Sequence, residues 1–201
     1  MLKRLFDIFL SSIGLILSSP FWLIFSLAIK LVDRGPVFYR QERVGKGGRI
    51  FNALKFRSMI KDAEKESGPI QAVENDPRVT KIGRILRATA MDELPQLWNI
   101  FKGDMSFVGP RALRPKEKEV HGNPDEMNIE DIPAYKERMA VRPGLTGMAQ
   151  VYLPTDALRS EKFKYDLLYI KNQSFLLDLK LIFLSFWITF RGKWESRQKK
   201  F

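Results

Sequence analysis

Two adjacent carboxylates, Asp92 and Glu93, are the residues of this sequence best suited to chemistry. They stand directly ahead of apolar residues with the i, i+3, i+4, i+7 spacing of one helix face, which are Leu94, Leu97, Trp98 and Phe101. The first turn of a helix holds carboxylates ionised and binds phosphate, because its N–H groups lack helical partners. With a divalent cation, Asp92 could therefore accept a phosphoryl group as a nucleophile. Simple capping of the helix is the alternative, and on the pair alone it is the more common role.

Basic side chains near turns favour the phosphoryl interpretation. Lys and Arg outnumber Asp and Glu by 34 to 23, and a net charge of +11 attracts nucleic acid, anionic lipid or nucleotide phosphates. The candidate phosphate-binding residues are Lys55, Arg57, Arg87, Arg111 and Arg142. Lys55 and Arg57 would share one strand face, and Arg111 and Arg142 adjoin Gly-Pro and Pro-Gly pairs, the second a predicted type II turn. A basic cluster alone is nevertheless more often a solvated surface.

The composition narrows the chemistry further. The 201 residues include no cysteine and a single histidine, His121. These counts exclude disulfides, thiolate nucleophiles and Cys-based zinc sites, and they argue against His-based metal sites and a Ser-His-Asp triad. Carboxylates, with Lys and Arg as charge stabilisers, are then the groups that remain for a reaction.

The N-terminal segment predicts a membrane helix. Residues 8–29 carry no charge, and these 22 residues would extend about 33 Å as a helix, enough to cross a hydrocarbon core of about 30 Å. Ser19-Pro20 interrupts the run, and Pro20 favours a kink because it lacks a backbone donor. Both flanks are basic, which the positive-inside rule places on one side of the membrane. A re-entrant helix is therefore as well supported as a spanning helix.

The remainder predicts an α+β fold. Residues 36–60 indicate a β-hairpin around Gly45-Lys46-Gly47-Gly48, and residues 158–173 indicate a helix. Shorter expected elements are a polar helix over 61–66, a helix that opens within 79–86, a loop over 107–110 and an exposed acidic loop or surface helix over 117–131. Residues 175–192 predict a C-terminal helix followed by a basic tail. This helix is either interfacial, with the tail as a cationic anchor, or buried.

Sequence blocks over nearly the whole chain, in order, resemble the bacterial sugar transferase family, the small monotopic polyprenol-phosphate phosphoglycosyl transferases. The first blocks are Lys3-Arg4-Leu5-Phe6-Asp7, Ser19-Pro20, Gly35-Pro36-Val37-Phe38, Lys55-Phe56-Arg57-Ser58-Met59 and Asp92-Glu93-Leu94-Pro95-Gln96. Further on come Lys102-Gly103-Asp104-Met105-Ser106-Phe107-Val108-Gly109-Pro110-Arg111, Arg142-Pro143-Gly144-Leu145-Thr146-Gly147, Tyr165-Asp166 and Asp178. Several long, specific blocks make a chance similarity very unlikely.

The resemblance implies a reaction and a site. Asp92 would attack the β-phosphate of a UDP-sugar, expel UMP and form a covalent aspartyl phosphosugar, which polyprenol (undecaprenyl) phosphate would then take over. Mg²⁺ is the implied cofactor, with Asp92 and Glu93 as its ligands. Lys55, Arg111 and Arg142 would stabilise the phosphoryl charge. Asp166 and Asp178 would support the site, with metal support, ribose binding and packing all left open as their roles.

The resemblance also implies an architecture. A re-entrant membrane helix broken at Ser19-Pro20 would occupy residues 1–34, and a catalytic domain would occupy residues 35–201 on the cytoplasmic face of the bacterial inner membrane. The implied partners are the UDP-sugar, the polyprenol phosphate, membrane lipid and downstream glycosyltransferases of glycan assembly, and a homodimer is compatible. The alternatives are a membrane-tethered nucleic-acid-binding protein and a purely structural scaffold. No DNA or RNA motif supports the first, and the second gives no reason for Asp92-Glu93 beside so many cations.

Overall fold

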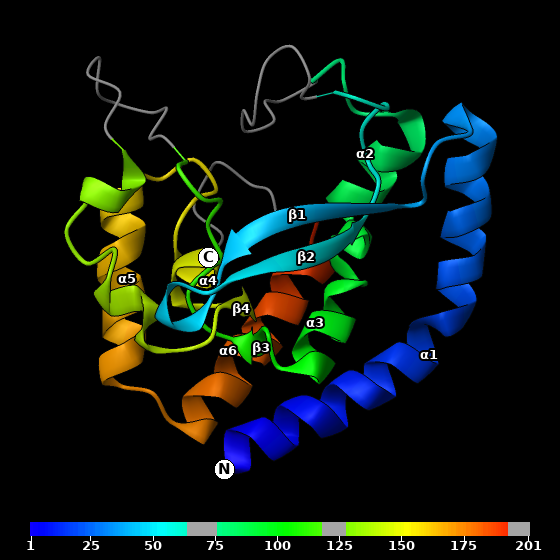
Figure 1. Cartoon of the computed structure of the whole chain (residues 1–201). Coiled ribbons are helices and arrows are strands. Elements are labelled where there is room, and N and C mark those ends of the chain that lie inside the picture. Colours follow the sequence, from blue (N-terminus) through cyan, green and yellow to red (C-terminus); the bar gives the residue numbers. More distant parts are fainter. Residues whose placement is uncertain (64–75, 118–127, 193–201) are drawn as a thin grey trace.

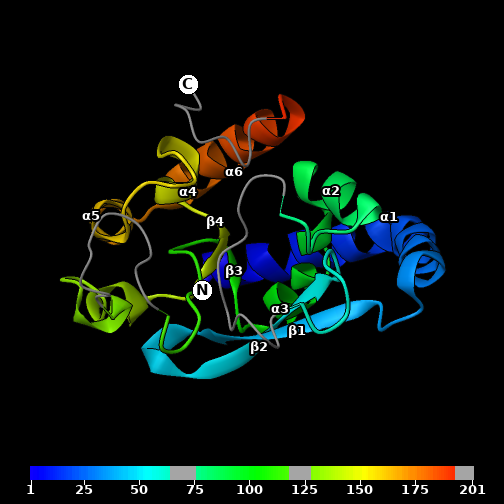
Figure 2. The same cartoon turned by 90° about the horizontal axis from the view of Figure 1, so that it is seen from above.

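A computed structural model describes residues 1–63, 76–117 and 128–192 of the chain. Its α-helices are α1 (Leu2–Asp33), α2 (Lys81–Ala88), α3 (Gln96–Lys102), α4 (Met148–Tyr152), α5 (Arg159–Lys171) and α6 (Phe175–Phe190). Its strands are β1 (Phe38–Val44), β2 (Ile50–Phe56), β3 (Ser106–Val108) and β4 (Gly144–Thr146). Seen from above, the β1–β2 hairpin lies on one side and α6 on the opposite side, with α3, β3 and β4 between them (Figure 2). The α+β expectation is confirmed.

Helix α1 bends along its length and runs along two sides of the rest of the molecule, at the bottom and at the right of Figure 1. Pro20 lies inside the helix, where it removes a backbone donor, and the Ser19 hydroxyl donates back to the Ile16 carbonyl at 2.8 Å. Within the described residues, α1 is the one helix long and apolar enough to cross a membrane, by length and composition. Many of its large apolar side chains are exposed, including Phe9, Ile16 and Leu23.

The inner face of α1 packs on two parts of the domain. In the first arm, Leu15 contacts the cluster around Leu97 and Ile100 of α3. In the second arm, inward-facing side chains join a cluster built on Phe56 and Leu86; these are Trp22, Phe25 and the fully buried Ile29. The Trp22 and Phe25 rings meet the Phe56 ring edge-on, with centroids 5.6 and 5.7 Å apart. Apolar burial thus attaches both arms of the bent helix to the domain.

Three charged residues at the start of α1 fasten it to elements that come much later in the chain. Lys3 Nζ lies 2.6 Å from Asp178 Oδ2 of α6, Arg4 donates to the Ile100 and Phe101 carbonyls at 2.6 and 2.7 Å, and Asp7 Oδ1 accepts from Ser106 Oγ and Phe107 N at 3.0 and 3.1 Å. Arg4 therefore donates to two carbonyls at the end of α3, of which the Ile100 carbonyl also accepts from Gly103 N at 3.0 Å.

The predicted hairpin is confirmed. β1 and β2 pair antiparallel with Phe38 opposite Phe56 and Val44 opposite Ile50. Gly47 and Gly48 of the connecting turn have φ of 64° and 79°, a left-handed conformation that glycine adopts without steric cost. Side chains alternate between the two faces, so Gln41, Arg43, Ala53 and Lys55 share the face that turns toward the domain.

The prediction of a type II turn at Pro143-Gly144 is wrong. Gly144 begins strand β4, which pairs parallel with β3, and its φ lies outside the left-handed region. A Cβ atom on Gly144 would lie 2.1 Å from the backbone nitrogen of Gly109, so the glycine is required for close backbone approach. The predicted loop over 107–110 is likewise part strand, because β3 extends to Val108.

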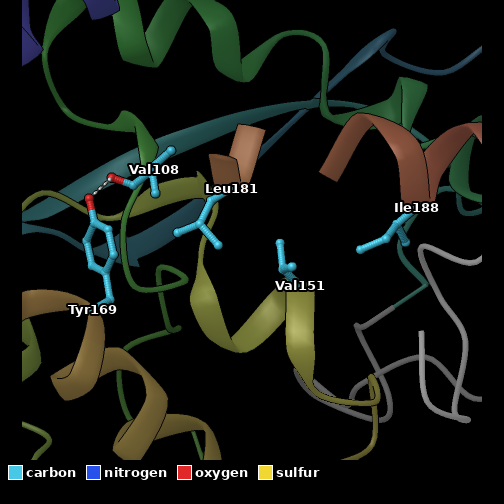
Figure 3. Close-up of a cluster of buried hydrophobic side chains, with 5 residues drawn as sticks. All are labelled: Val108, Val151, Tyr169, Leu181 and Ile188. Atoms are coloured by element: carbon cyan, nitrogen blue, oxygen red, sulfur yellow. Dashed lines mark hydrogen bonds between the residues drawn. The ribbon is translucent and has the colours of Figure 1, made fainter. Parts of the chain in front are cut away.

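A core cluster joins β3, α4, α5 and α6 through Val108, Val151, Tyr169, Leu181 and Ile188 (Figure 3). The Tyr169 hydroxyl lies 3.2 Å from the Val108 carbonyl and donates to Asp178 Oδ1 at 2.7 Å. Leu181 and Ile188 are buried on α6, whereas Phe183, Phe186 and Phe190 are exposed. The buried interpretation of the C-terminal helix is therefore right for one of its faces, and an interfacial position of the other, exposed apolar face stays a prediction.

Helices α2 and α5 confirm the predictions over 79–86 and 158–173. Other predictions fall wholly or partly outside the described residues, namely the acidic segment over 118–127, the basic tail and the second half of the polar helix over 61–66. The first half of that predicted helix is wrong, because residues 61–63 form a turn in which Asp62 has a φ of 57°. Glu117, at the edge of that acidic segment, is not exposed as predicted but pairs with Arg159 of α5 at 2.7 Å.

Candidate active site

Glu93 is the centre of a small buried ion cluster. Its Oε1 atom accepts a hydrogen bond from Lys55 Nζ at 2.6 Å and another from Arg111 Nη2 at 2.8 Å. Lys55 comes from β2 and Arg111 follows β3, so the cluster joins parts of the sequence that lie far apart. Two of the predicted phosphate-binding residues are thereby brought to the predicted carboxylate pair.

The Asp92-Glu93 pair is held by apolar residues on either side of it. The chain leaves α2, turns at Ala90 with a φ of 55° and forms a single 3₁₀ turn over Met91–Glu93. Met91 and Leu94 pack against the Phe56 and Leu86 cluster. Asp92 and Glu93 are themselves buried, with 8% and 6% of their surfaces exposed. Anchoring on both sides thus fixes the direction of two adjacent carboxylates.

The capping alternative for Asp92 is wrong. Helix α3 begins at Gln96, its N-cap position is Pro95, and no side chain caps it. The expected apolar face of this helix is also different, because Leu97 and Ile100 are buried while the rings of Trp98 and Phe101 stack at 5.6 Å and remain exposed. The carboxylates are therefore positioned by the 3₁₀ turn and its apolar neighbours, rather than by the first turn of α3.

Asn99 aligns α3 with β2. Its side-chain oxygen accepts from Leu54 N at 2.9 Å, and its side-chain nitrogen donates to the Asn52 carbonyl at 2.8 Å. These bonds lie next to Lys55 and therefore fix the strand opposite Glu93. Sequence reasoning missed Asn99, because the predicted apolar face of the helix leaves position 99 on the opposite side.

The two cations keep Glu93 ionised. Burial alone would raise the pKa of the Glu93 carboxyl, but the charges of Arg111 and Lys55, with their hydrogen bonds, outweigh it. The net effect holds the pKa of Glu93 well below its usual range. The same interaction raises the pKa of Arg111. Glu93 is therefore a permanently charged partner of its two cations at neutral pH.

A third cation lines the same pocket. The pocket is bounded by Arg43, Lys55, Glu93 and Arg111, together with Ala53, Gln96, Met105, Ala112 and Gly144. Burial, followed by the like charge of Arg111, lowers the pKa of Arg43 to about 10, so the guanidinium stays protonated at neutral pH. Arg43 is one of several cations in residues 40–61, and it was not singled out from the sequence as a phosphate-binding residue. The available signal was the even spacing that places Arg43 and Lys55 on one face of the hairpin.

The other predicted phosphate-binding residues are not among those that line the pocket; these are Arg57, Arg87 and Arg142. Arg57 follows the end of β2, and its guanidinium lies against Gly35 rather than among the residues that line the pocket. Arg87 is in the last turn of α2, and Arg142 precedes β4 and acts electrostatically on Asp7.

The two predicted supporting acids are buried in ion pairs outside the pocket lining. Asp166 pairs with Arg138 at 2.7 Å, and Asp178 pairs with Lys3 at 2.6 Å. Both contacts join separate elements: Asp166 links α5 to the 3₁₀ turn over Glu137–Ala140, and Asp178 links α6 to α1.

The carboxylates can be tested against the implied Mg²⁺. Within the described residues, no group of three or more acidic or histidine side chains could enclose a metal ion. Mg²⁺ is nevertheless usually bound through one or two carboxylates and substrate phosphates, and it keeps several waters. Two adjacent carboxylates beside a cation-lined pocket fit that mode of binding, and they do not fit an all-protein cage.

Comparisons with known proteins show what the chain is similar to. A family model described as bacterial sugar transferase matches residues 1–192. A UDP-glucose:undecaprenyl-phosphate glucose-1-phosphate transferase of Klebsiella pneumoniae is 43% identical over 196 residues, which cover 95% of this chain and 40% of the relative. The exopolysaccharide production protein PSS of Rhizobium leguminosarum bv. phaseoli is 44% identical over 188 residues, which cover 90% of this chain and 92% of the relative.

A third relative is a UDP-N-acetylgalactosamine-undecaprenyl-phosphate N-acetylgalactosaminephosphotransferase of Aeromonas hydrophila. It is 41% identical over 185 residues, which cover 90% of this chain and 42% of the relative. The chain thus spans about two-fifths of the length of the Klebsiella and Aeromonas proteins and nearly all of the Rhizobium protein.

Proposed function

The chain belongs to the bacterial sugar transferase family, and from this premise we propose that it transfers a sugar 1-phosphate from a UDP-sugar to undecaprenyl phosphate. The products are undecaprenyl diphosphate sugar and UMP, and the reaction begins the membrane stage of glycan assembly. The observation that carries this proposal is the buried Asp92-Glu93 pair, in which Glu93 lines a pocket with Arg43, Lys55 and Arg111 and Asp92 is its direct neighbour in the chain. Because the chain belongs to this family, the alternative of a nucleic-acid-binding protein is dropped.

The transfer takes place in two displacements at one phosphorus atom. In the first, a carboxylate oxygen of Asp92 bonds to the β-phosphorus of the UDP-sugar, the bridging P–O bond breaks, and UMP departs with the electron pair. In the second, a phosphate oxygen of undecaprenyl phosphate bonds to the same phosphorus and Asp92 leaves. Asp92 returns to its initial state, and no water is consumed.

Glu93 and its cations organise this chemistry. Glu93 is bonded to Lys55 and Arg111, so it orients both cations and leaves the nucleophilic role to Asp92. Arg111 retains 39% of its side-chain surface and can therefore contact a diphosphate while it holds Glu93. Fixed cations stabilise the charge that develops on the transferring phosphoryl group.

Mg²⁺ is the cofactor of the proposed reaction, and Asp92 and Glu93 would hold it together with substrate phosphates. When bound, it would neutralise charge on the diphosphate and so reduce its repulsion of Asp92.

The proposed topology is re-entrant, with the domain on the cytoplasmic face of the bacterial inner membrane. The bend of α1, its exposed apolar side chains and its basic flanks support this arrangement. A site at the membrane surface can reach both a water-soluble nucleotide sugar and a lipid-anchored phosphate. Because the chain has no cysteine, single cysteines at Leu2 and Val37 can be labelled with a membrane-impermeant reagent. Labelling from opposite sides of the membrane would contradict the re-entrant arrangement.

The activity is tested by release of UMP from a panel of UDP-sugars, with Mg²⁺ and undecaprenyl phosphate. We expect release with at least one sugar, its loss on chelation, and its loss in Asp92→Asn. Asp156→Asn, at an exposed aspartate ahead of α5, is the matched control and should retain activity. Intact-mass analysis after incubation with the UDP-sugar alone should detect the phosphosugar adduct in the wild type only. Unchanged UMP release from Asp92→Asn would contradict the assignment of the nucleophile.

A further inference from the structure

The segment that carries Arg111 is held in an unusual way. Residues 110–113 follow β3 without regular helix or strand, apart from one bridge between Arg111 and Gly144, yet each of their carbonyl groups accepts a hydrogen bond from another element. The donors, in order, are Gly144 N at 2.9 Å, Arg138 Nη2 at 2.7 Å, Arg43 Nη1 at 2.8 Å and Val44 N at 2.8 Å. Four consecutive peptide groups are thus fixed from β4, from the 3₁₀ turn over Glu137–Ala140 and from β1.

Two of these donors are guanidinium groups, and burying a guanidinium costs free energy because its charge is taken out of water. Arg138 is buried, with 6% of its surface exposed, and the partly buried Arg43 side chain lies near charges of both signs, those of Arg111 and Arg114 and those of Glu117 and Glu93. A backbone N–H would satisfy a carbonyl without taking a charge out of water. The use of charged donors at positions 111 and 112 therefore needs an explanation beyond the satisfaction of backbone carbonyls.

Asp166 determines the direction of Arg138. Its Oδ2 atom accepts from Arg138 Nε at 2.9 Å and from Arg138 Nη2 at 2.7 Å, and only 2% of Asp166 is exposed. The guanidinium also lies over the Phe163 ring, 4.6 Å from its centroid. Both Asp166 and Phe163 belong to α5, so that helix holds a cation whose Nη2 atom donates to the Arg111 carbonyl as well as to Asp166.

We propose that Asp166 and Arg138 form a positioning pair for Arg111, and that Arg43 completes the clamp at the next carbonyl. The inference rests on the proposed function, in which Arg111 contacts the diphosphate. It assigns Asp166 to the support of a phosphate-binding arginine and not to metal support or ribose binding. It also makes Arg138 and Arg43 part of the machinery, although neither was a candidate from sequence.

The clamp acts through geometry. The Arg111 guanidinium must lie 2.8 Å from Glu93 and still face the pocket, and its backbone is the base from which the side chain extends. Misplacement of a catalytic group by about 1 Å can reduce a rate by about 100-fold. A backbone fixed at four successive carbonyls keeps this displacement small, and the positive charge of Arg43, which lines the pocket, favours an anion there.

A double-mutant cycle tests the proposal. Arg138→Lys keeps the charge next to Asp166 but loses the planar fork that reaches two acceptors at once. We expect it to lower kcat/KM for UMP release about 10- to 100-fold in the wild-type background and less than about 2-fold in an Arg111→Ala background. Asp166→Asn should behave in the same way. Equal fold losses in both backgrounds would overturn the proposal, because they would mean that Asp166 and Arg138 act independently of Arg111.

Two controls separate positioning from misfolding and from failure of the proposed reaction. Glu137→Gln, at the exposed neighbour of Arg138, should leave activity unchanged. Hydrogen exchange of the peptide around residues 110–114 should accelerate in Arg138→Lys while the rest of the protein keeps wild-type protection. That readout needs no activity: unchanged exchange overturns the clamp, whereas accelerated exchange in a protein that releases no UMP contradicts the proposed function and retains the clamp.

Discussion

Neutralising Glu93 tests whether the ion cluster stabilises the protein. Glu93→Gln removes one buried charge that two cations share, Lys55 at 2.6 Å and Arg111 at 2.8 Å. Breaking a fully buried pair costs about 3 to 5 kcal/mol, because the remaining charge has lost its partner and its water. Arg111 keeps 39% of its side-chain surface and can be hydrated again, and a glutamine oxygen still accepts a hydrogen bond. We therefore expect a loss of about 2 to 3 kcal/mol at neutral pH.

The expected loss of stability corresponds to a measurable fall in Tm. For a chain of this length, about 1 kcal/mol lowers the Tm by about 2 to 4 °C, so Glu93→Gln should unfold about 4 to 12 °C below the wild type. The assay is thermal unfolding of both proteins in the same detergent, followed by near-UV circular dichroism. Glu42→Gln is the matched control, because Glu42 lies exposed on the neighbouring strand β1 and its loss should shift the Tm very little.

The pH dependence gives the reasoning its sharper test. The pKa of Glu93 is depressed in the folded protein from an ordinary value of 4.5, so folding favours the ionised form. The stabilisation is fully present above pH 4.5 and is lost as the pH falls through the depressed folded value. The Tm gap between wild type and Glu93→Gln should therefore be widest near neutral pH and shrink progressively below pH 4.5. A gap that stays constant down to pH 3, or that is absent at pH 7, would refute the account.

Two further predictions concern the framework of the site. Lys3→Met leaves the carboxylate of Asp178 buried with only 4% of its surface exposed, and it should destabilise the protein by about 2 kcal/mol in thermal unfolding. Gly83→Ala places a Cβ atom 1.9 Å from the Ser58 carbonyl oxygen, which is backbone, so we expect a loss of about 3 kcal/mol. Gly14→Ala is the contrast, since its Cβ meets only the flexible Leu97 side chain at 3.1 Å and should change stability by less than about 1 kcal/mol.

Local signals in the sequence predicted the elements that depend on local physics. The hairpin follows from glycines at a turn and alternating side chains, and both were visible before the structure. The Pro143-Gly144 turn failed because the reason for that glycine is a contact with Gly109, which is 35 residues away and unknowable from the dipeptide. Periodicity located α3 but assigned its buried face wrongly. The rule assumes that apolar residues avoid the outside, whereas the rings of Trp98 and Phe101 stack on each other at the exposed surface.

The candidate site divides in the same manner. Asp92 and Glu93 were recognisable because adjacent carboxylates ahead of a helix are a local pattern. Lys55 and Arg111 are two of many cations in the sequence, and only the folded structure shows that they bind Glu93. The pairing of Arg138 with Asp166 joins residues 28 positions apart. Such partners are determined by how elements pack, and a single sequence carries no measure of that.

The charge of the pocket shows why this cluster is more than a structural ion pair. Buried ion pairs are weak devices for stability, because desolvation consumes most of the attraction. A stabilising pair would need one cation for Glu93, whereas the pocket contains Arg43, Lys55 and Arg111. Of the residues that line the pocket, three are cations and one, Glu93, is a carboxylate, and burial together with the like charge of Arg111 lowers the pKa of Arg43. In the proposed reaction, an arriving diphosphate would relieve that repulsion, so that the free energy spent on assembling the cations is recovered as binding of the substrate, at the place where negative charge develops during transfer.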